Sequence, residues 1–364
     1  MQITRPTLLL DKTRVQRNIE KMVDKARRHG VTLRPHFKTH QSAQIGEWFR
    51  DHGIDRITVS SIEMAHYFAQ NGWRDILIAF PVNIRAIDTL NMLAQTLNLH
   101  LVVESQETIA YLIRHLKQPA TLWLKVDTGY GRTGVPTSDE ELLLTLTEQI
   151  VWTPHLQLGG LLAHAGHSYF ARSPEEVVAI FDDTRKQLYY LKTMLEQACG
   201  IEIQISVGDT PGCSLATKFD GIDEIRPGNF VFYDLMQLRL GACDEQDIAV
   251  AVACPVVAKH ADRNEVIIHG GAVHLSKEAL EEDGQPPHYG YVCRLLDDRW
   301  SRHLNGARVR ALSQEHGIVS LPRQDFERIR IGELLVVLPV HSCLTANLMR
   351  GYLTFDDEAL GMMR

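Results

Sequence analysis

The sequence has no apolar run that approaches the roughly 20 residues needed for a helix across a membrane. Its start, Met1-Gln-Ile-Thr-Arg5-Pro6, lacks an apolar core and a small-residue cleavage site, so we expect no signal peptide. Positive charge is not in excess either, because 38 lysines and arginines are outnumbered by 45 acidic residues and the formal net charge is −7. These absences argue against a membrane protein and against nucleic acid as a partner, and they favour a small-molecule substrate.

The sequence also lacks a CxxC pair. Its six cysteines are scattered, at Cys199, Cys213, Cys243, Cys254, Cys293 and Cys343. This pattern is typical of reduced thiols in a cytoplasmic protein rather than of a disulfide framework. With 364 residues, 45% hydrophobic and 23% charged, the chain is long enough for two globular domains or one barrel with an addition.

Strand-like and helix-like stretches alternate over the first two thirds of the chain. Asp11 is well placed to cap a helix that runs to about His29, and helical spacing of apolar residues predicts another helix from Glu175 to Cys199. The strand-like runs are residues 31–37, 56–60, 76–80, 99–103, 121–126, 158–162, 203–207 and 224–226. This order predicts an α/β fold, a (β/α)8 TIM barrel over residues 11–238. A doubly wound open sheet is the alternative, although it usually has fewer strands.

The character of the sequence changes after about residue 240. Short strand-like runs follow one another with few helical stretches between them, at residues 248–252, 255–258, 265–268, 317–321 and 333–338. We therefore predict a mostly β domain made of residues 239–364 together with residues 1–10.

The segment Arg34-Pro-His-Phe-Lys-Thr-His40 stands at the end of the first strand-like run. Because successive strand residues point to opposite faces, Arg34, His36 and Lys38 are predicted to share one face. Three cationic side chains in water-poor surroundings would repel one another unless an anion or an electrophile binds there. From these residues alone, a solvated strand end with a surface lysine is an equal alternative.

Glycine-rich polar segments follow the last two predicted barrel strands, at the face where barrel enzymes place their active sites. Gly208, Gly212 and Gly228 would let the backbone approach an anion, and the Thr210 hydroxyl would help to bind it. Ordinary turn chemistry is the alternative. Together with a lysine at a strand end, a phosphate site suggests pyridoxal phosphate (PLP) bound covalently by Lys38.

Several motifs resemble those of one family, the D-threonine aldolase and D-serine dehydratase group of the alanine-racemase-like, fold-type III PLP enzymes. They are Pro6-Thr-Leu-Leu-Leu10-Asp, Arg34-Pro-His-Phe-Lys-Thr-His40, Lys125-Val-Asp-Thr-Gly-Tyr-Gly-Arg-Thr-Gly134, His164-Ala-Gly-His-Ser-Tyr169, Arg226-Pro-Gly-Asn-Phe230 and Pro339-Val-His-Ser-Cys343. The resemblance covers nearly the whole chain. It implies a PLP barrel followed by a β domain, usually assembled as a homodimer.

The resemblance also implies roles for individual residues. Lys38 would form the Schiff base with PLP and take the α-proton of the substrate, with Arg132 near the phenolic oxygen of the cofactor and Tyr169 beside it. The other residues of the cofactor site would be His36, His164, Thr210, Gly228 and Asn229, the last three at the phosphate, and Arg226 at the pyridine nitrogen. Arg226 resembles alanine racemase, whereas many aldolase and dehydratase relatives carry a less basic residue there.

His341 and Cys343 are two residues apart and are predicted to face the same way. Imidazole and thiolate together suit zinc, with manganese or magnesium as alternatives, and two protein ligands leave room for a substrate oxygen. A buried histidine beside a buried cysteine is the ordinary interpretation. The resemblance favours a metal, and it associates His-x-Cys with the dehydratases and His-x-Asp with the aldolases. His269 and His274 are further histidines that could be ligands, although histidines with other partners are commoner in such domains.

Taken together, the sequence and the resemblance predict a PLP- and metal-dependent lyase acting on D-3-hydroxy amino acids. The favoured reaction is dehydration of D-serine or D-threo-3-hydroxyaspartate to a keto acid and ammonia, and retro-aldol cleavage to glycine and an aldehyde is the alternative. A racemase would need a tyrosine from the β domain that is not evident near Ile267-Ile-His-Gly-Gly271. A non-catalytic PLP carrier would end with the barrel.

Overall fold

The computed structural model describes residues 2–282 and 284–363. The chain forms two compact units. The barrel unit comprises Lys21–Lys38 and Gly46–Gly228, and the β unit comprises Thr39–Ile45 with the N-terminal residues up to Glu20 and the chain from Asn229 onward. The predicted domain boundaries at residues 11 and 238 stay a proposal. Among the described residues, no helix is long and apolar enough to cross a membrane.

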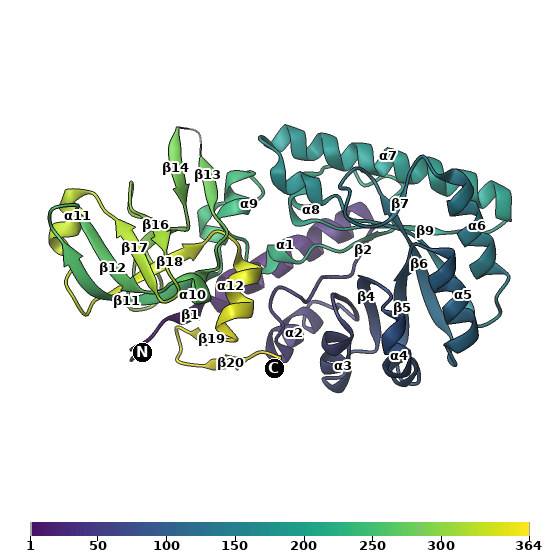
Figure 1. Ribbon diagram of the computed structural model, residues 1–364, viewed down its shortest axis with the longest axis horizontal. Helices are drawn as coiled ribbons and strands as arrows, with labels where there is room; N and C mark the ends of the chain where they lie inside the picture. Colours follow the sequence, from purple (N-terminus) through teal and green to yellow (C-terminus); the bar gives the residue numbers. More distant parts are fainter. Residues whose placement is uncertain (1, 283, 364) are drawn as a thin grey trace. The chain divides into compact units, whose positions relative to one another are not determined.

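A parallel sheet of eight strands, in the order β2-β10-β9-β8-β6-β5-β4-β3, forms the core of the barrel unit (Figure 1). The two ends of this order nearly meet, because His36 forms a parallel bridge with Thr58 of β3, and the Phe37 N–H donates to the Thr58 carbonyl. This arrangement confirms the predicted (β/α)8 barrel. The strands are β2 (Thr32–Leu33), β3 (Arg56–Val59), β4 (Asp75–Pro81), β5 (Asn98–Val103), β6 (Ala120–Asp127), β8 (Leu156–Ala163), β9 (Gln204–Val207) and β10 (Glu224–Ile225), and β7 (Val135–Pro136) pairs with β6.

The first barrel strand is shorter than predicted. β2 covers only Thr32–Leu33 of the predicted run 31–37. Pro35 has no N–H to donate to a ladder, and the chain turns after His36. The expectation that Arg34 shares an unpaired cationic face with His36 and Lys38 is also wrong, because buried carboxylates already neutralise Arg34, as described below.

Helices connect the strands of the barrel unit, and their ends follow local sequence signals. Ser173 caps the long helix α7 by accepting the Glu176 N–H at 3.3 Å, and Gly200 ends it in the left-handed conformation, at φ 64°. The predicted helix between residues 175 and 199 is thereby confirmed. The helices are α2 (Ala43–Arg50), α3 (Ile62–Gln70), α4 (Ile87–Ala94), α5 (Gln106–His115), α6 (Glu140–Val151), α7 (Pro174–Cys199) and α8 (Thr210–Leu215), with 3-10 turns η1 (Ile84–Ala86) and η2 (Gly166–Phe170).

Nine strands form the sheet of the β unit, in the order β12-β17-β16-β15-β18-β11-β1-β19-β20. β12 also pairs with β11, which closes six of these strands into a ring. The strands are β1 (Thr7–Leu10), β11 (Val250–His260), β12 (Glu265–His269), β15 (Gly290–Arg294), β16 (Arg308–Leu312), β17 (His316–Ser320), β18 (Leu334–Pro339), β19 (Gly351–Thr354) and β20 (Ala359–Gly361). A separate hairpin joins β13 (Leu280–Glu282) and β14 (Gln285–His288).

The remaining helical elements include α1 (Lys12–His29), which begins at the predicted cap: an Asp11 carboxylate oxygen accepts the Arg14 N–H at 3.0 Å. The others are η3 (Asn229–Val231), α9 (Leu235–Arg239), η4 (Glu245–Asp247), α10 (Ala272–Leu275), α11 (Arg323–Arg328) and α12 (Ser342–Met349). The N-terminal strand β1 pairs antiparallel with β11, with Leu9 opposite Ala251, so residues 7–10 do lie in the β sheet.

Candidate active site

The loop after β6 is shaped by a single carboxylate. Asp127 Oδ1 accepts the N–H groups of Gly129, Tyr130 and Gly131 at 2.9–3.1 Å. Gly134 allows the chain to return against β6, because a Cβ at that position would lie 2.6 Å from the Asp127 nitrogen. The loop carries Arg132, which is exposed and lies over the ring of Tyr130 at 5.0 Å. The hydrogen bonds of Asp127 thus fix the conformation of the turn that precedes Arg132.

Two neutral histidines lie close to Lys38, whose side chain is exposed. Burial and the positive charge of Lys38 hold the pKa of His36 well below its usual range, and the same two causes act on His164. His36 Nδ1 accepts the main-chain N–H of Lys38 at 3.4 Å, and His164 Nδ1 donates to the Gly208 carbonyl. Both imidazoles are therefore uncharged and oriented, so Lys38 does not share its face with two further cations.

The segment that follows β9 contains Thr210, a buried threonine whose hydroxyl is not hydrogen-bonded within the described residues. Thr210 is fully buried, and its Oγ1 has no hydrogen-bond partner among the described residues. Its main-chain N–H donates to the Tyr169 hydroxyl at 3.3 Å, and Asp209 caps α8 by accepting the Gly212 N–H at 2.5 Å. A buried hydroxyl without a partner is costly, and a phosphate oxygen would satisfy it. The residues present thus fit the phosphate of PLP.

The glycines in this region have a packing explanation as well. A Cβ on Gly212 would lie 2.6 Å from Asp209 Oδ1, and one on Gly208 would lie 3.0 Å from the Arg226 Cβ. Both glycines therefore make room for neighbouring side chains. Close approach of a ligand to these two positions stays a prediction.

Arg226 is held at the end of β10 by groups inside the barrel. Its Nε donates to Ser206 Oγ at 2.7 Å and its Nη2 donates to the Ala163 carbonyl at 2.6 Å. Ser206 in turn donates to Glu224 Oε1 at 2.7 Å. Burial lowers the pKa of Arg226 to about 10, so the guanidinium stays charged at neutral pH. The structure therefore provides a fixed cation here, 4% exposed.

Lys125 has no role in the sequence-based prediction, although it belongs to the quoted motif. It lies on β6, is 6% exposed, and its pKa is lowered to about 7 by burial and by the positive charges of Arg226 and Arg132. A lysine within the apolar run Thr121–Val126 was the signal that could have identified it. A pKa this close to neutrality makes the charge at the end of β6 depend on pH.

We expect Lys125→Met to stabilise the protein without bound ligands at pH 6 more than at pH 10. The pKa of Lys125 is about 7 in the folded protein and 10.5 for an unperturbed lysine, so folding releases a proton between these pH values and stability falls as the pH drops through that window. Each pKa unit is worth about 1.4 kcal/mol. Thermal unfolding midpoints at both pH values measure the effect, with exposed Lys117→Met as the control. An equal shift at both pH values would contradict the assignment.

His341 and Cys343 come together at the start of α12, where His341 is the N-cap residue. Burial alone would lower the pKa of His341, but its hydrogen bond to Cys343 and nearby negative charges raise it to about 9. The His341 Nδ1 atom is buried without a hydrogen-bond partner among the described residues. An unsatisfied imidazole nitrogen beside a thiol fits a soft divalent metal ion.

Two further residues of the β unit touch Cys343. The Thr39 hydroxyl lies 3.3 Å from its Sγ, and Asn229 Nδ2 lies 3.6 Å from it. Asn229 Nδ2 also donates to Asp234 Oδ2 at 2.6 Å and to Ser342 Oγ at 3.0 Å. The Asn229 side-chain donor is thus used within the β unit, and the contact of Asn229 with the cofactor phosphate stays a prediction. Sequence reasoning missed Thr39.

Fold and site together define a class, the barrel enzymes built like alanine racemase. The model of the alanine racemase N-terminal domain matches residues 10–235, and that of a serine dehydratase domain matches residues 249–355. The chain belongs to the D-serine dehydratase and D-threonine aldolase family of alanine-racemase-like enzymes.

Named relatives cover nearly the whole chain. A D-threo-3-hydroxyaspartate dehydratase of Delftia sp. is 32% identical, over 93% of this chain and 91% of its own. D-serine dehydratase of Dictyostelium discoideum is 29% identical over 97% and 93%, and D-threonine aldolase of an Arthrobacter species is 26% identical over 98% and 90%.

The solved structure of the Delftia dehydratase superimposes with a TM-score of 0.91 at 29% identity, covering 100% of this chain and 98% of that one. Two further structures of a dehydratase of that name are of a cysteine-to-alanine variant in the metal-free form and of a histidine-to-alanine variant. Their altered positions lie two residues apart, which is also the spacing of His341 and Cys343.

Proposed function

We propose that this protein is a PLP- and metal-dependent lyase that dehydrates a D-3-hydroxy amino acid to a keto acid and ammonia. The observation that carries the proposal is the pair His341 and Cys343, hydrogen-bonded to each other with an unsatisfied buried imidazole nitrogen. The metal-free form of a related dehydratase and the spacing of its two altered residues support a metal at this pair. D-Serine and D-threo-3-hydroxyaspartate are the two substrates proposed.

The residues that would hold PLP lie mostly in the barrel unit. Lys38 would bind it covalently, Thr210 with the main chain of Gly228 and Asn229 would bind the phosphate, and Arg132, Tyr169, His36, His164 and Arg226 would surround the ring. When bound, PLP draws electrons from the α-carbon of an amino acid.

Lys38 would act as the base that removes the α-proton. His36 and His164 beside it are both neutral, because burial and the charge of Lys38 hold their pKa values low, so neither ring is a second cation at this position. Arg226 would keep a positive charge beside the pyridine nitrogen, and a cation there leaves that nitrogen unprotonated and makes the ring a weaker electron sink. A fixed cation there disfavours a long-lived carbanion and favours loss of the β-hydroxyl together with the α-proton.

His341 and Cys343 would hold a divalent metal, most plausibly zinc by donor type, with manganese and magnesium as the other candidates. Such an ion supplies Lewis acidity for the departing hydroxyl. The Cα–H and Cβ–O bonds break, the hydroxyl leaves with its electron pair, and the released enamine hydrolyses to the keto acid and ammonia.

We expect the protein with PLP to convert D-serine to pyruvate and ammonia, to lose this activity on chelation and to regain it with zinc. The physical reason is that hydroxide is a poor leaving group unless a Lewis acid takes up its charge. Pyruvate and ammonia are measured for D-serine, and oxaloacetate and ammonia for D-threo-3-hydroxyaspartate. Turnover unchanged after thorough chelation would remove the metal from the proposal.

Retro-aldol cleavage is the second candidate, because a D-threonine aldolase is among the relatives that match nearly the full chain. The same scaffold would then release the proton of the hydroxyl and break the Cα–Cβ bond. Glycine and acetaldehyde from D-threonine would establish it. We also propose that the chain assembles as a homodimer, as the family resemblance implies, and light scattering of the purified protein tests this.

A further inference from the structure

Two histidines and a glutamate of the β unit place their ligand atoms together, away from the pair His341 and Cys343 in the sequence. His269 ends β12, His274 lies in α10, and Glu315 precedes β17. The Nε2 atoms of His269 and His274 lie 3.6 Å and 3.7 Å from Glu315 Oε2, and the ligand atoms of all three lie within 4.8 Å of one another. The two rings are nearly perpendicular, at 86°.

The backbone holds this trio firmly in place. β12 and β17 pair antiparallel up to His269 opposite His316, which brings Glu315 beside the end of β12. The Gly270 N–H then donates to the Glu315 carbonyl at 2.9 Å, and the Ala272 N–H donates to the Ser313 carbonyl at 2.8 Å. A Cβ on Gly271 would collide with the main chain of Gln314. The α10 segment is therefore packed directly against the loop that carries Glu315.

We propose that His269, His274 and Glu315 bind a divalent metal ion of the zinc class, at a site distinct from the pair His341 and Cys343. Two imidazoles and one carboxylate are a donor set that zinc takes up with a fourth position left for water. The donor atoms already face one common point, so binding requires little movement of the backbone.

The protonation of the trio is compatible with a cation. Burial lowers the pKa of His274, which favours the neutral ring that a metal ion requires. The Gly271 N–H donates to His274 Nδ1 at 3.2 Å, which leaves the ring proton on Nε2, facing Glu315. Coordination through Nε2 would move that hydrogen to Nδ1 and end the contact with Gly271. The free energy of metal binding must therefore exceed the cost of losing the Gly271–His274 hydrogen bond and the His274–Glu315 contact.

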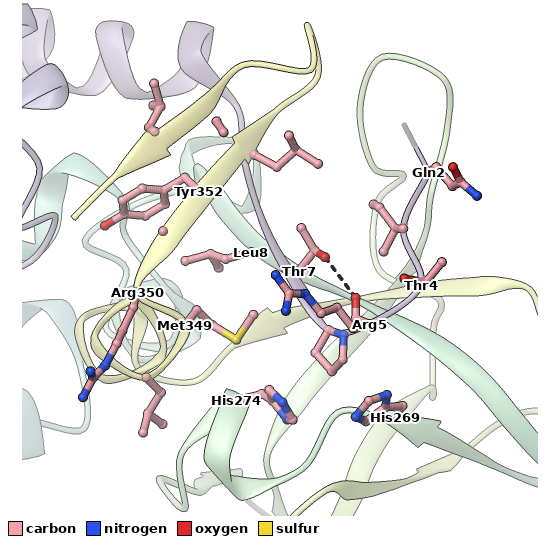
Figure 2. A pocket seen from close by; sticks show the side chains of 17 residues that line it. Gln2, Thr4, Arg5, Thr7, Leu8, His269, His274, Met349, Arg350 and Tyr352 are labelled. Atoms are coloured by element: carbon pink, nitrogen blue, oxygen red, sulfur yellow. Dashed lines mark hydrogen bonds between the residues drawn. The ribbon is translucent and has the colours of Figure 1, made fainter. Parts of the chain in front are cut away.

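The site has a solvent path. A pocket of about 700 Å³ is lined by His269 and His274, by the N-terminal segment around Arg5 and by the chain from Leu348 to Leu353. Figure 2 shows the two imidazoles on one side of this pocket, beneath the segment that carries Arg5. About 39% of the His269 side chain and 47% of the Glu315 side chain are exposed, so an ion can enter from water.

An ion bound by the trio would also restrict the motion of α10, which contacts the helix that carries Cys343. The Leu275 carbonyl of α10 accepts the Thr345 hydroxyl of α12 at 3.3 Å, and α12 carries Cys343. Leu275, next to His274, thus connects the trio to the helix of the proposed catalytic metal, although the trio itself does not depend on the proposed activity.

The test uses the full chain with His341→Ala and Cys343→Ala combined, so that zinc bound at the proposed catalytic pair is excluded. We expect this background to retain one zinc per chain by mass spectrometry of metals after dialysis. His269→Ala or Glu315→Gln added to it should weaken zinc binding at least about tenfold in calorimetric titration. His316→Ala, next to Glu315 but outside the trio, is the matched control and should bind as the background does.

A background chain that binds no zinc, or binds it equally well with and without His269 and Glu315, would overturn the proposal. The Glu315→Gln variant keeps the size of the side chain, so loss of binding there does not reflect misfolding, and circular dichroism verifies this. Because the readout is metal content, the result is independent of whether the protein proves to be a dehydratase.

Discussion

Replacing Lys38 with alanine is expected to lower turnover by about 10³–10⁴-fold and to abolish covalent retention of PLP. Lys38 is the one residue to which the proposed function assigns both the covalent hold on the cofactor and the removal of the α-proton. Its amine lies close enough to His36 and His164 to lower both pKa values, and it is exposed to an incoming ligand. Lys125 is the other amine near His164, and it is buried where Lys38 is exposed.

The measurement combines two readouts on the same protein. Wild type and variant are incubated with PLP, reduced with borohydride and digested, and the peptide that carries Lys38 is analysed by mass spectrometry. Wild type should carry the reduced adduct there, and the variant should carry none and lose its visible absorption band. Exposed Lys117→Ala is the control and should behave as wild type. An adduct on Lys125 in the wild type would reassign the cofactor-binding lysine, and an unchanged visible band in the variant would refute the role of Lys38.

Much of the fold follows from the sequence because its signals are local. Alternating apolar runs and helical periodicities predicted all eight barrel strands, and caps such as Asp11 and Ser173 lie within a few residues of the helices they begin. The β unit was harder. Its predicted strands 248–252 and 255–258 form one continuous strand, β11, and the short strands β15 and β16 were not predicted. Strands such as Arg308–Leu312 are only five residues long, so their alternation of arginine and apolar residues is too short to stand out from the neighbouring loops.

The sequence could predict only those site residues that stand in recognisable motifs, and not their contacts with distant residues. Lys38, Thr210 and the pair His341 and Cys343 are predicted because each stands in a recognisable segment. What the sequence could not supply is the partner from elsewhere in the chain. Thr39 contacts Cys343 across 304 residues, and Arg34 meets Glu224 across 190 residues. The second pairing depends on closure of the barrel, because Glu224 lies on its last strand, and it decides that the charge of Arg34 is already neutralised.

The barrel unit contains a buried network of charged side chains that is formed by residues far apart in the sequence. Arg34 is 2% exposed, and its Nε donates to Glu224 Oε2 at 2.6 Å, while its Nη1 pairs with Asp75. Glu224 continues through Ser206 to Arg226. The network therefore joins the start of β4, where Asp75 lies, to the arginine proposed to face the cofactor ring.

We expect Arg34→Met to destabilise the protein by about 3–5 kcal/mol, because it leaves Glu224 buried at 4% exposure without its cation. The midpoint of urea denaturation measures this. Arg56→Ala is the control: its ion pair with Asp55 is 37% and 74% exposed, so its loss should cost less than about 1 kcal/mol. The double variant Arg34→Met, Glu224→Gln removes both buried charges and should recover part of the stability.

The advantage of wild type over Arg34→Met should also depend on pH. Burial raises the pKa of Asp75, but its hydrogen bond with His100 and the charge of Arg34 outweigh burial and bring it well below its usual range. A carboxyl with a lowered folded-state pKa stabilises above its unfolded value of about 3.9, and this contribution is lost as the pH falls further. The difference between the two proteins should be full at pH 7 and shrink below about pH 4. A difference that persists undiminished in acid would mean that Arg34 stabilises the barrel by packing, and the charge network would then serve to orient Arg226 rather than to hold the fold.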